Sequence, residues 1–168
     1  MARVAGEQFV DLDPSHAPLL AALPIRRLGQ PHTQVVADSI SGIGQRLGNG
    51  FEGVGLLDGV ALRAVAIWRE DPPLYGEHPS TWELSYLATH ASFPRRGYAR
   101  RAKIEVLRRA QRAAVVQVIS HVHQDNGGML SLNDSIGGER RRVDGEEFVL
   151  VVCFVDHCLA AAAATGYR

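Results

Sequence analysis

The sequence is poor in cysteine, in aromatic residues and in net charge. Its 168 residues include 2 cysteines and 7% aromatic residues, and 18 basic side chains balance 18 acidic ones. The cysteines, Cys153 and Cys158, form neither a C-x-x-C pair nor a disulfide framework, which favours a reducing compartment. A neutral chain has no overall field that attracts a polyanion or an anionic membrane, so any charge effect must be local.

The sequence also lacks a run of apolar residues long enough to cross a bilayer. A spanning helix needs roughly 20 predominantly apolar residues, and the N-terminus shows no apolar signal core. We therefore expect a cytoplasmic protein without a membrane partner. Hydrophobic residues make up 46% of the chain, enough for one ordinary core at this length, so we expect one domain over residues 1–168.

Hydrophobic spacing and turn residues predict alternating strands and helices. Strands are expected at 8–12, 51–57, 60–68, 82–89, 115–122, 139–142 and 146–155. Helices are expected after Ser15, over 33–47, over 97–114 and between Asn126 and Gly137, and the tail 156–168 is interpreted as a helical turn or a disordered end. This order predicts an α/β (α+β) fold with a mixed, mostly antiparallel central sheet of about six to seven strands and about four helices.

Three segments carry more detailed expectations. Asp58-Gly59 and Asp144-Gly145 predict hairpins between the strands that flank them. The proline-rich segment 70–79 predicts an exposed acidic loop whose Glu70, Asp71 and Glu77 could attract a cationic amine, although such a loop is more often only a solvated surface. In the helix over 97–114, small apolar residues predict a narrow face for close packing on a sheet.

A basic turn lies between the strand over 82–89 and the following helix. Pro94-Arg95-Arg96-Gly97-Tyr98-Ala99 would begin that helix, where backbone N–H groups lack intrahelical partners and the helix dipole adds positive charge. Gly97 and Ala99 permit close approach, and arginines add charge-assisted hydrogen bonds. The pattern predicts a pyrophosphate site, although a basic helix start is also typical of a solvated cap.

A second element follows about thirty residues downstream, where Asn126, Met129, Asn133 and Gly137 recur along a short helix. Together the two elements resemble the GCN5-related N-acetyltransferase (GNAT) family, in which a Q/R-x-x-G-x-G/A turn holds the coenzyme A pyrophosphate. The resemblance covers about residues 82–155. It implies a GNAT-like fold and an enzyme that moves an acetyl group from acetyl-CoA, its co-substrate, to a primary amine.

The resemblance also implies which residues contact acetyl-CoA. The strand end and the turn supply most of them, and Asn126 contacts the pantetheine arm, although Asn126 also reads as a helix N-cap. The expected contacts are Ala88, Thr89, Arg95, Arg96, Gly97, Tyr98, Ala99, Arg100 and Asn126. A small-molecule amine is the expected acceptor, and homodimers are common in the family.

Two positions depart from the family pattern. Pro94 stands where glutamine or arginine is usual, which removes one side-chain contact worth on the order of 1 kcal/mol. Asn133 stands where many members carry a tyrosine that acts as general acid, and an amide cannot supply a proton at neutral pH. Backbone N–H groups near Thr89 are expected to stabilise the oxyanion.

The reaction needs a base, because an alkyl amine has a pKa of about 10 and is protonated at neutral pH. Family geometry points to Glu83, which otherwise reads as a solvent-facing carboxylate. His90, next to the proposed acetyl site, is the second candidate, with a surface role as its other interpretation. His121 and His123 share a strand face, but no third ligand is evident, so no metal is expected.

Two other functions remain open. Pro94 and Asn133 also suit a module that binds acyl-CoA without turnover. Nucleic-acid binding through the arginine-rich helix is a second alternative, but such proteins are usually basic overall and this chain is neutral, so no nucleic-acid partner is expected.

Overall fold

The computed structural model describes residues 6–24, 46–71, 78–142, 145 and 147–166. The strands in these ranges are β1 (Glu7–Leu12), β2 (Phe51–Asp58), β3 (Ala61–Glu70), β4 (Thr81–Thr89), β5 (Gln117–His123), β6 (Glu139–Arg142) and β7 (Phe148–Phe154). The helices are the short 3-10 helix η1 (Pro14–His16) and the α-helices α1 (Ala17–Ala21), α3 (Tyr98–Arg112), α4 (Gly127–Ser135) and α5 (Val155–Ala164). The predicted helix over 33–47 falls almost wholly outside the described residues.

The strands follow the hydrogen-bonded order β1-β2-β3-β4-β5-β7-β6 in a seven-stranded sheet. The pairs β1–β2, β2–β3, β5–β7 and β6–β7 are antiparallel, whereas β4 and β5 are parallel. The predicted mixed fold with a mostly antiparallel sheet and about four helices is therefore confirmed. No helix in the described ranges has the length and apolar character needed to span a bilayer.

Two compact units divide the chain between them. The N-terminal unit comprises Ala2–Arg69 and Tyr86–Lys103, and the C-terminal unit comprises Glu70–Ser85 and Ile104–Arg168. Their boundaries fall inside β4 and α3, so each of these elements contributes residues to both units. The expectation of a single domain over residues 1–168 stays a prediction.

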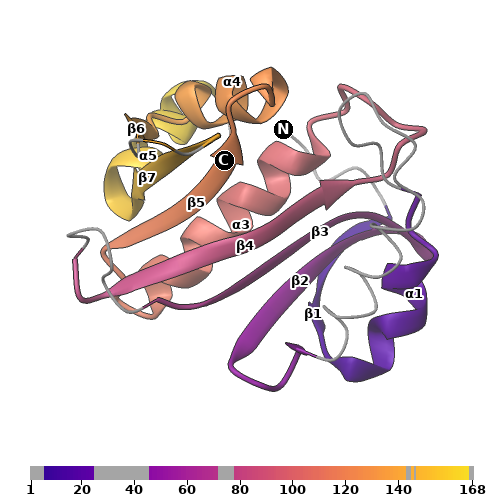
Figure 1. Cartoon of the computed structure of the whole chain (residues 1–168). Coiled ribbons are helices and arrows are strands. Elements are labelled where there is room, and N and C mark those ends of the chain that lie inside the picture. The colour runs from indigo at the N-terminus through magenta and orange to yellow at the C-terminus, as the bar shows by residue number, and fades with distance from the viewer. Residues whose placement is uncertain (1–5, 25–45, 72–77, 143–144, 146, 167–168) are drawn as a thin grey trace. The chain divides into compact units, whose positions relative to one another are not determined.

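The core of the N-terminal unit joins α1 to β1 and β3, and Figure 1 draws α1 beside β1 and β2. Its buried members are Leu12, Leu20, Leu23, Leu47, Leu62, Val65, Ile67 and Ala88. β2 runs between β1 and β3 and contributes Gly53 and Gly55 where this core is tightest. A Cβ added at Gly55 would lie 2.9 Å from Leu62 Cδ1 and 3.2 Å from Leu12 Cδ2. The missing side chains therefore make room for the leucines.

The hairpin predicted at Asp58-Gly59 is confirmed. Asp58 pairs with Ala61, which leaves Gly59 and Val60 as a two-residue loop. Gly59 has a φ of 61° at the first loop position, where a type II′ hairpin turn needs glycine. The second predicted hairpin also forms, because β6 and β7 pair antiparallel, but Asp144 of its turn lies outside the described residues.

The C-terminal unit contains β5, β7 and β6 side by side, with β7 in the middle (Figure 1). Four consecutive residues of β7, 150–153, are buried. Successive strand residues point to opposite faces, so both faces of β7 are covered, as its unbroken apolar sequence predicts.

The C-terminal tail is a regular helix, which corrects the expectation of a helical turn or a disordered end. α5 begins at Val155, the residue that the sequence assigned to the end of the strand. Asp156 lies in its first turn, accepts a hydrogen bond from Gln111 Nε2 at 2.7 Å, and suits the positive end of the helix dipole. Five alanines, the best helix formers, follow in the same helix.

Two local expectations were wrong. The buried face of α3 is not narrow and small, because Ile104 and Leu107 are buried beside Ala102, Val106 and Ala110. The acidic loop is not exposed throughout, because Asp71 is only 7% exposed and its N–H donates to Thr81 O. Glu70 is exposed, and Glu77 lies outside the described residues.

The close packing at β2 predicts a specific sensitivity to added volume. Gly55→Ala should reduce the free energy of unfolding by about 1–3 kcal/mol, because its methyl group overpacks the core at Leu62. Gly127→Ala is the matched control, since nothing lies within 4 Å of a Cβ at this position in the first turn of α4. Urea denaturation should show no loss for the control, and equal losses in both variants would contradict the packing argument.

Candidate functional site

The basic turn lies at the start of α3, within the N-terminal unit. The residues from Pro94 to Gly97 are exposed and Tyr98 is buried. Arg95 and Gly97 both adopt positive φ values, of 60° and 74°. Left-handed residues in a tight turn rotate successive N–H groups toward one side and so form an anion-binding concavity. The turn therefore has the backbone form that phosphate oxygens require.

The space above the turn is open among the described atoms. A Cβ placed on Gly97 would meet nothing within 4 Å. The first intrahelical bond of α3 runs from Arg101 N to Gly97 O at 3.0 Å. The amides of the first helical turn precede that bond and, by helix geometry, have no acceptor within the helix. A phosphate group can thus approach the backbone here without displacing a side chain of the described part.

An aromatic and cationic cluster holds the loop ahead of the turn. The Arg63 guanidinium lies 4.1 Å from the centre of the Phe93 ring, which contacts His90 edge-on at 5.0 Å. His90 N–H donates to Arg63 O at 2.8 Å. Such cation–π and edge contacts favour one loop geometry. Phe93 also meets Tyr98 at 6.5 Å, so the cluster reaches the first residue of α3.

His90 uses one ring nitrogen inside this loop. Its Nδ1 accepts the Ser92 N–H at 3.2 Å, which in a neutral imidazole places the proton on Nε2. A base needs a free lone pair, and the lone pair on Nδ1 is already engaged. These contacts favour a structural role for His90, and its catalytic role stays a prediction.

The other residues near the turn that were predicted to contact acetyl-CoA differ in how far they are exposed to solvent. Ala88 packs into the core of the N-terminal unit, so only its backbone is accessible to a ligand. Thr89, Ala99 and Arg100 are half-buried. The parallel ladder between β4 and β5 covers only Thr81–Glu83, so it ends six residues before Thr89, where the sequence placed the opening of the strands.

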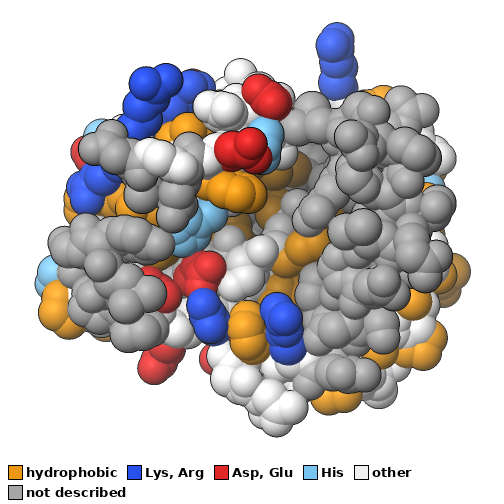
Figure 2. All heavy atoms as spheres, in the orientation of Figure 1, with side chains coloured by type: hydrophobic (Ala, Val, Ile, Leu, Met, Phe, Trp, Pro, Cys, Tyr) orange, Lys and Arg blue, Asp and Glu red, His pale blue; other side chains and the backbone are white. Residues whose placement is uncertain are grey.

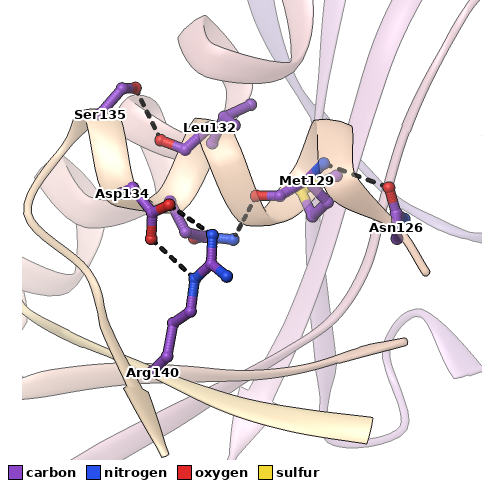
Figure 3. Close-up of polar contacts among 7 residues, drawn as sticks. Asn126, Met129, Leu132, Asp134, Ser135 and Arg140 are labelled. Atoms are coloured by element: carbon purple, nitrogen blue, oxygen red, sulfur yellow. Dashed lines mark hydrogen bonds and ion pairs between the residues drawn. The ribbon is translucent and has the colours of Figure 1, made fainter. Parts of the chain in front are cut away.

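Asn126 lies in the C-terminal unit and caps α4 (Figure 3). Its Oδ1 accepts the Met129 N–H at 3.1 Å, which confirms the predicted N-cap. The cap occupies Oδ1, and the Nδ2 group is the remaining donor of the amide. A contact between Asn126 and a pantetheine arm stays a prediction.

Asn133 is fully buried on the same helix. Its Nδ2 donates to Met129 O at 2.8 Å, and the Cys153 Sγ–H donates weakly toward its Oδ1 at 3.8 Å. Gly138 packs against this residue, since an added Cβ would lie 3.1 Å from Asn133 O. Both ends of the amide are thus engaged inside the unit. Asn133 stabilises the packing of α4 on β7, and nothing in these contacts supplies a proton.

Arginines also gather on β6, at the upper left of Figure 2. Arg140 Nε donates to Asp134 Oδ1 at 2.9 Å, and Arg140 Nη2 contacts the second oxygen of the same carboxylate (Figure 3). The hydrogen bond that Arg140 donates to the Asp134 carboxylate raises the pKa of Arg140. This bidentate pair joins β6 to α4 at the surface. Arg140 thus has a structural role that requires no bound ligand.

Glu83 acquires a partner that the sequence did not indicate. The parallel register sets Glu83 opposite Ile119, and His121, two residues further along β5, brings its Nδ1 to 3.8 Å from Glu83 Oε1. The Glu83 side chain is 16% exposed, whereas His121 is an exposed residue of β5 whose side chain is 29% exposed. A carboxylate beside an imidazole is a pair that can accept and hold a proton. The sequence indicates His121 only as a possible metal ligand, because the register between two strands is not readable from one sequence.

The two histidines of β5 have separate partners. His123 Nε2 lies 3.4 Å from Glu147 and its Nδ1 lies 3.7 Å from Asp125, both exposed. Within the described ranges, no group of three His, Cys, Asp or Glu side chains is arranged to hold a metal ion.

Several solved structures that share this fold are N-acetyltransferases or GNAT-family proteins. PaiA N-acetyltransferase from Thermoplasma acidophilum, solved with coenzyme A, matches with a TM-score of 0.69 at 10% identity over 88% of this chain and 98% of its own. A GNAT-family protein from Desulfovibrio desulfuricans gives 0.69 at 14% identity, over 89% and 99%. Ribosomal-protein-alanine N-acetyltransferase from Brucella melitensis gives 0.63 at 16%, over 86% and 96%. No protein-family model and no curated protein sequence matches the chain. The expected GNAT-like fold is therefore confirmed.

The open turn predicts how Gly97 variants should bind coenzyme A. Gly97→Glu should weaken binding roughly 100-fold or more, because a carboxylate in the turn repels the phosphates. Gly145→Glu is the matched control, since Gly145 has a φ of 81° and equally open surroundings outside the turn. Isothermal titration calorimetry should show wild-type affinity for the control, and unchanged affinity in Gly97→Glu would exclude this turn as the phosphate site.

Proposed function

We propose that this chain is an N-acetyltransferase that moves an acetyl group from acetyl-CoA to the primary amine of a small molecule. The observation that carries the proposal is the left-handed turn at Arg95 and Gly97, which leads into α3 of a fold shared with N-acetyltransferases. An exposed turn of backbone donors, at the start of a 15-residue helix, suits a pyrophosphate. The coenzyme A in the PaiA structure supports the same ligand class.

The proposed reaction is a direct transfer. The neutral amine nitrogen attacks the thioester carbonyl, the resulting tetrahedral intermediate loses the carbon–sulfur bond, and the sulfur departs as a thiolate. The amine proton passes to the Glu83 carboxylate. The Nδ1 atom of His121 lies 3.8 Å from this carboxylate. Backbone N–H groups near Thr89 are proposed to stabilise the oxyanion.

The leaving group does not need a strong acid. A thiol has a pKa of about 8.5 by analogy with cysteine, so its thiolate is a tolerable leaving group near neutral pH. This matters because Asn133 occupies the position of the family's tyrosine and its amide is engaged in the helix. The thiolate is therefore proposed to leave without a general acid at position 133.

A binding module is the second candidate, and the burial of Asn133 favours it. A fold that keeps the turn but lacks both the usual turn side chain at Pro94 and an acid could bind acyl-CoA without turnover. The two functions share the phosphate turn and differ only in chemistry. They are separated by measuring binding and thiol release on the same preparation.

The proposed activity is tested with acetyl-CoA and a panel of polyamines, amino acids, aminoglycosides and a lysine peptide. Saturating acetyl-CoA, at about 100 times its Kd, should stabilise the fold by about 2.7 kcal/mol, and at least one small amine should release free thiol. Stabilisation without thiol release from any amine would favour the binding module. No stabilisation at all would refute both functions.

Glu83→Gln should lower kcat about 100- to 10,000-fold near neutral pH, the range ascribed to a general base. The deficit should shrink as pH rises toward 10, because a growing fraction of the amine is then already deprotonated. Glu139→Gln is the control, since Glu139 is an exposed carboxylate on β6. A pH–rate profile identical to wild type in Glu83→Gln would remove Glu83 from the mechanism.

A further inference from the structure

Arg101 connects three separate parts of the N-terminal unit. Its Nη1 donates to Glu7 Oε2 in β1 at 2.7 Å, and its Nη2 donates to Arg96 O in the turn at 3.2 Å. Its guanidinium also lies 4.7 Å from the centre of the Tyr98 ring. The Arg101 side chain is 20% exposed and that of Glu7 13%. The charge of this arginine is thus used inside the protein.

The acceptor in the turn is the informative contact. Arg96 lies between the two left-handed residues, Arg95 and Gly97. In a trans peptide the C=O and the following N–H point in opposite directions. A guanidinium that holds Arg96 O therefore directs the Gly97 N–H away from itself, and the space beside the Gly97 Cα is open, since a Cβ built there would meet nothing within 4 Å.

The burial of Arg101 indicates that these contacts fix its place. Its Nε is buried and makes no hydrogen bond within the described residues, which is costly for a polar group. The contacts of the rest of the planar guanidinium offset this cost: Nη1 binds Glu7, Nη2 binds the Arg96 carbonyl, and the flat face lies over the Tyr98 ring. A freely solvated surface arginine would keep all of its donors in water.

We propose that Arg101 and Glu7 are positioning residues for the anion site. They hold the Arg96–Gly97 peptide so that the Gly97 N–H faces the pyrophosphate of acyl-CoA, without touching the ligand themselves. The inference rests on the proposed function and deepens it. It assigns the ligand contact to backbone and gives the arginine a role that its charge alone does not predict.

The positioning role and a direct charge role predict opposite effects at Glu7. If Arg101 attracted phosphate as a free cation, Glu7→Ala would release that cation and tighten coenzyme A binding. Under the positioning role, Glu7→Ala lets the fork leave Arg96 O, and binding weakens although the protein becomes more positive. Arg101→Lys separates the roles again, because lysine keeps the charge but lacks the fork that spans two acceptors.

The test is calorimetric titration of coenzyme A into wild type, Glu7→Ala, Arg101→Lys and the control Arg109→Lys, whose arginine pairs with Glu105 at 3.0 Å further along α3. We expect Glu7→Ala and Arg101→Lys to bind coenzyme A roughly tenfold more weakly than wild type, or weaker still, which corresponds to the loss of about one charged hydrogen bond. The control should keep wild-type affinity. In wild type, the Gly97 amide proton should move downfield in nitrogen–proton correlation spectra when coenzyme A binds, and this shift should shrink in Arg101→Lys.

Equal or tighter binding by Glu7→Ala would overturn the positioning role while leaving the proposed function standing. Absence of binding to wild type would overturn the proposed function itself, so the two failures are distinguishable. If Glu7→Ala does not fold, Glu7→Gln takes its place, since it removes the same charge with little change of shape. For steady-state kinetics, the positioning role predicts a raised KM for acetyl-CoA with kcat nearly unchanged, and a loss confined to kcat would contradict it.

Discussion

The backbone conformation of residues 95–97 is the constraint on which the proposed site depends. A left-handed conformation costs a residue with a side chain about 1–2 kcal/mol, and Arg95 adopts one at a φ of 60°. Nearby contacts must therefore hold the turn, and they come from β1 through Glu7 and from β3 through Arg63. Because Glu7 and Arg63 hold the turn from the protein side, its exposed face carries the peptide N–H groups together with the side chains of Arg95 and Arg96.

The polar groups described in the two units differ in kind. The N-terminal unit contains backbone N–H donors, which do not act as acids or bases near neutral pH and need no particular side chain. The C-terminal unit supplies side chains, with Glu83 beside His121 and Asn126 at the start of α4. The backbone groups suit binding of a phosphorylated carrier, whereas the Glu83–His121 pair suits proton transfer, so variants of the turn and of this pair should separate binding from turnover.

Local patterns predicted the elements, and long-range contacts escaped them. Strand alternation, the Asp58-Gly59 turn and the Asn126 cap depend on neighbours within a few residues, so the strands and the turn before α3 were readable. The α5 boundary was not, because the apolar strand runs directly into Val155 and the alanines that follow carry no N-cap signal. The Glu7–Arg101 pair spans 94 residues, and the Glu83–His121 pair depends on parallel register. Neither leaves a periodicity in one sequence.

The same contacts explain why an arginine-rich helix need not be a nucleic-acid surface. Arg101 is paired with Glu7, while Arg109 and Arg112 both reach Glu105, at 3.0 and 3.4 Å. A polyanion binds by exchanging its counterions for unneutralised cations, and two carboxylates, Glu7 and Glu105, offset part of the charge of these three arginines. The helix therefore offers less binding charge than its composition indicates. Arg95 and Arg96 are exposed in the turn before it, and Arg112 is exposed at its other end. The two adjacent arginines of the turn suit a ligand with a few phosphates at one point, whereas a charged polymer would need a row of unpaired cations along the helix.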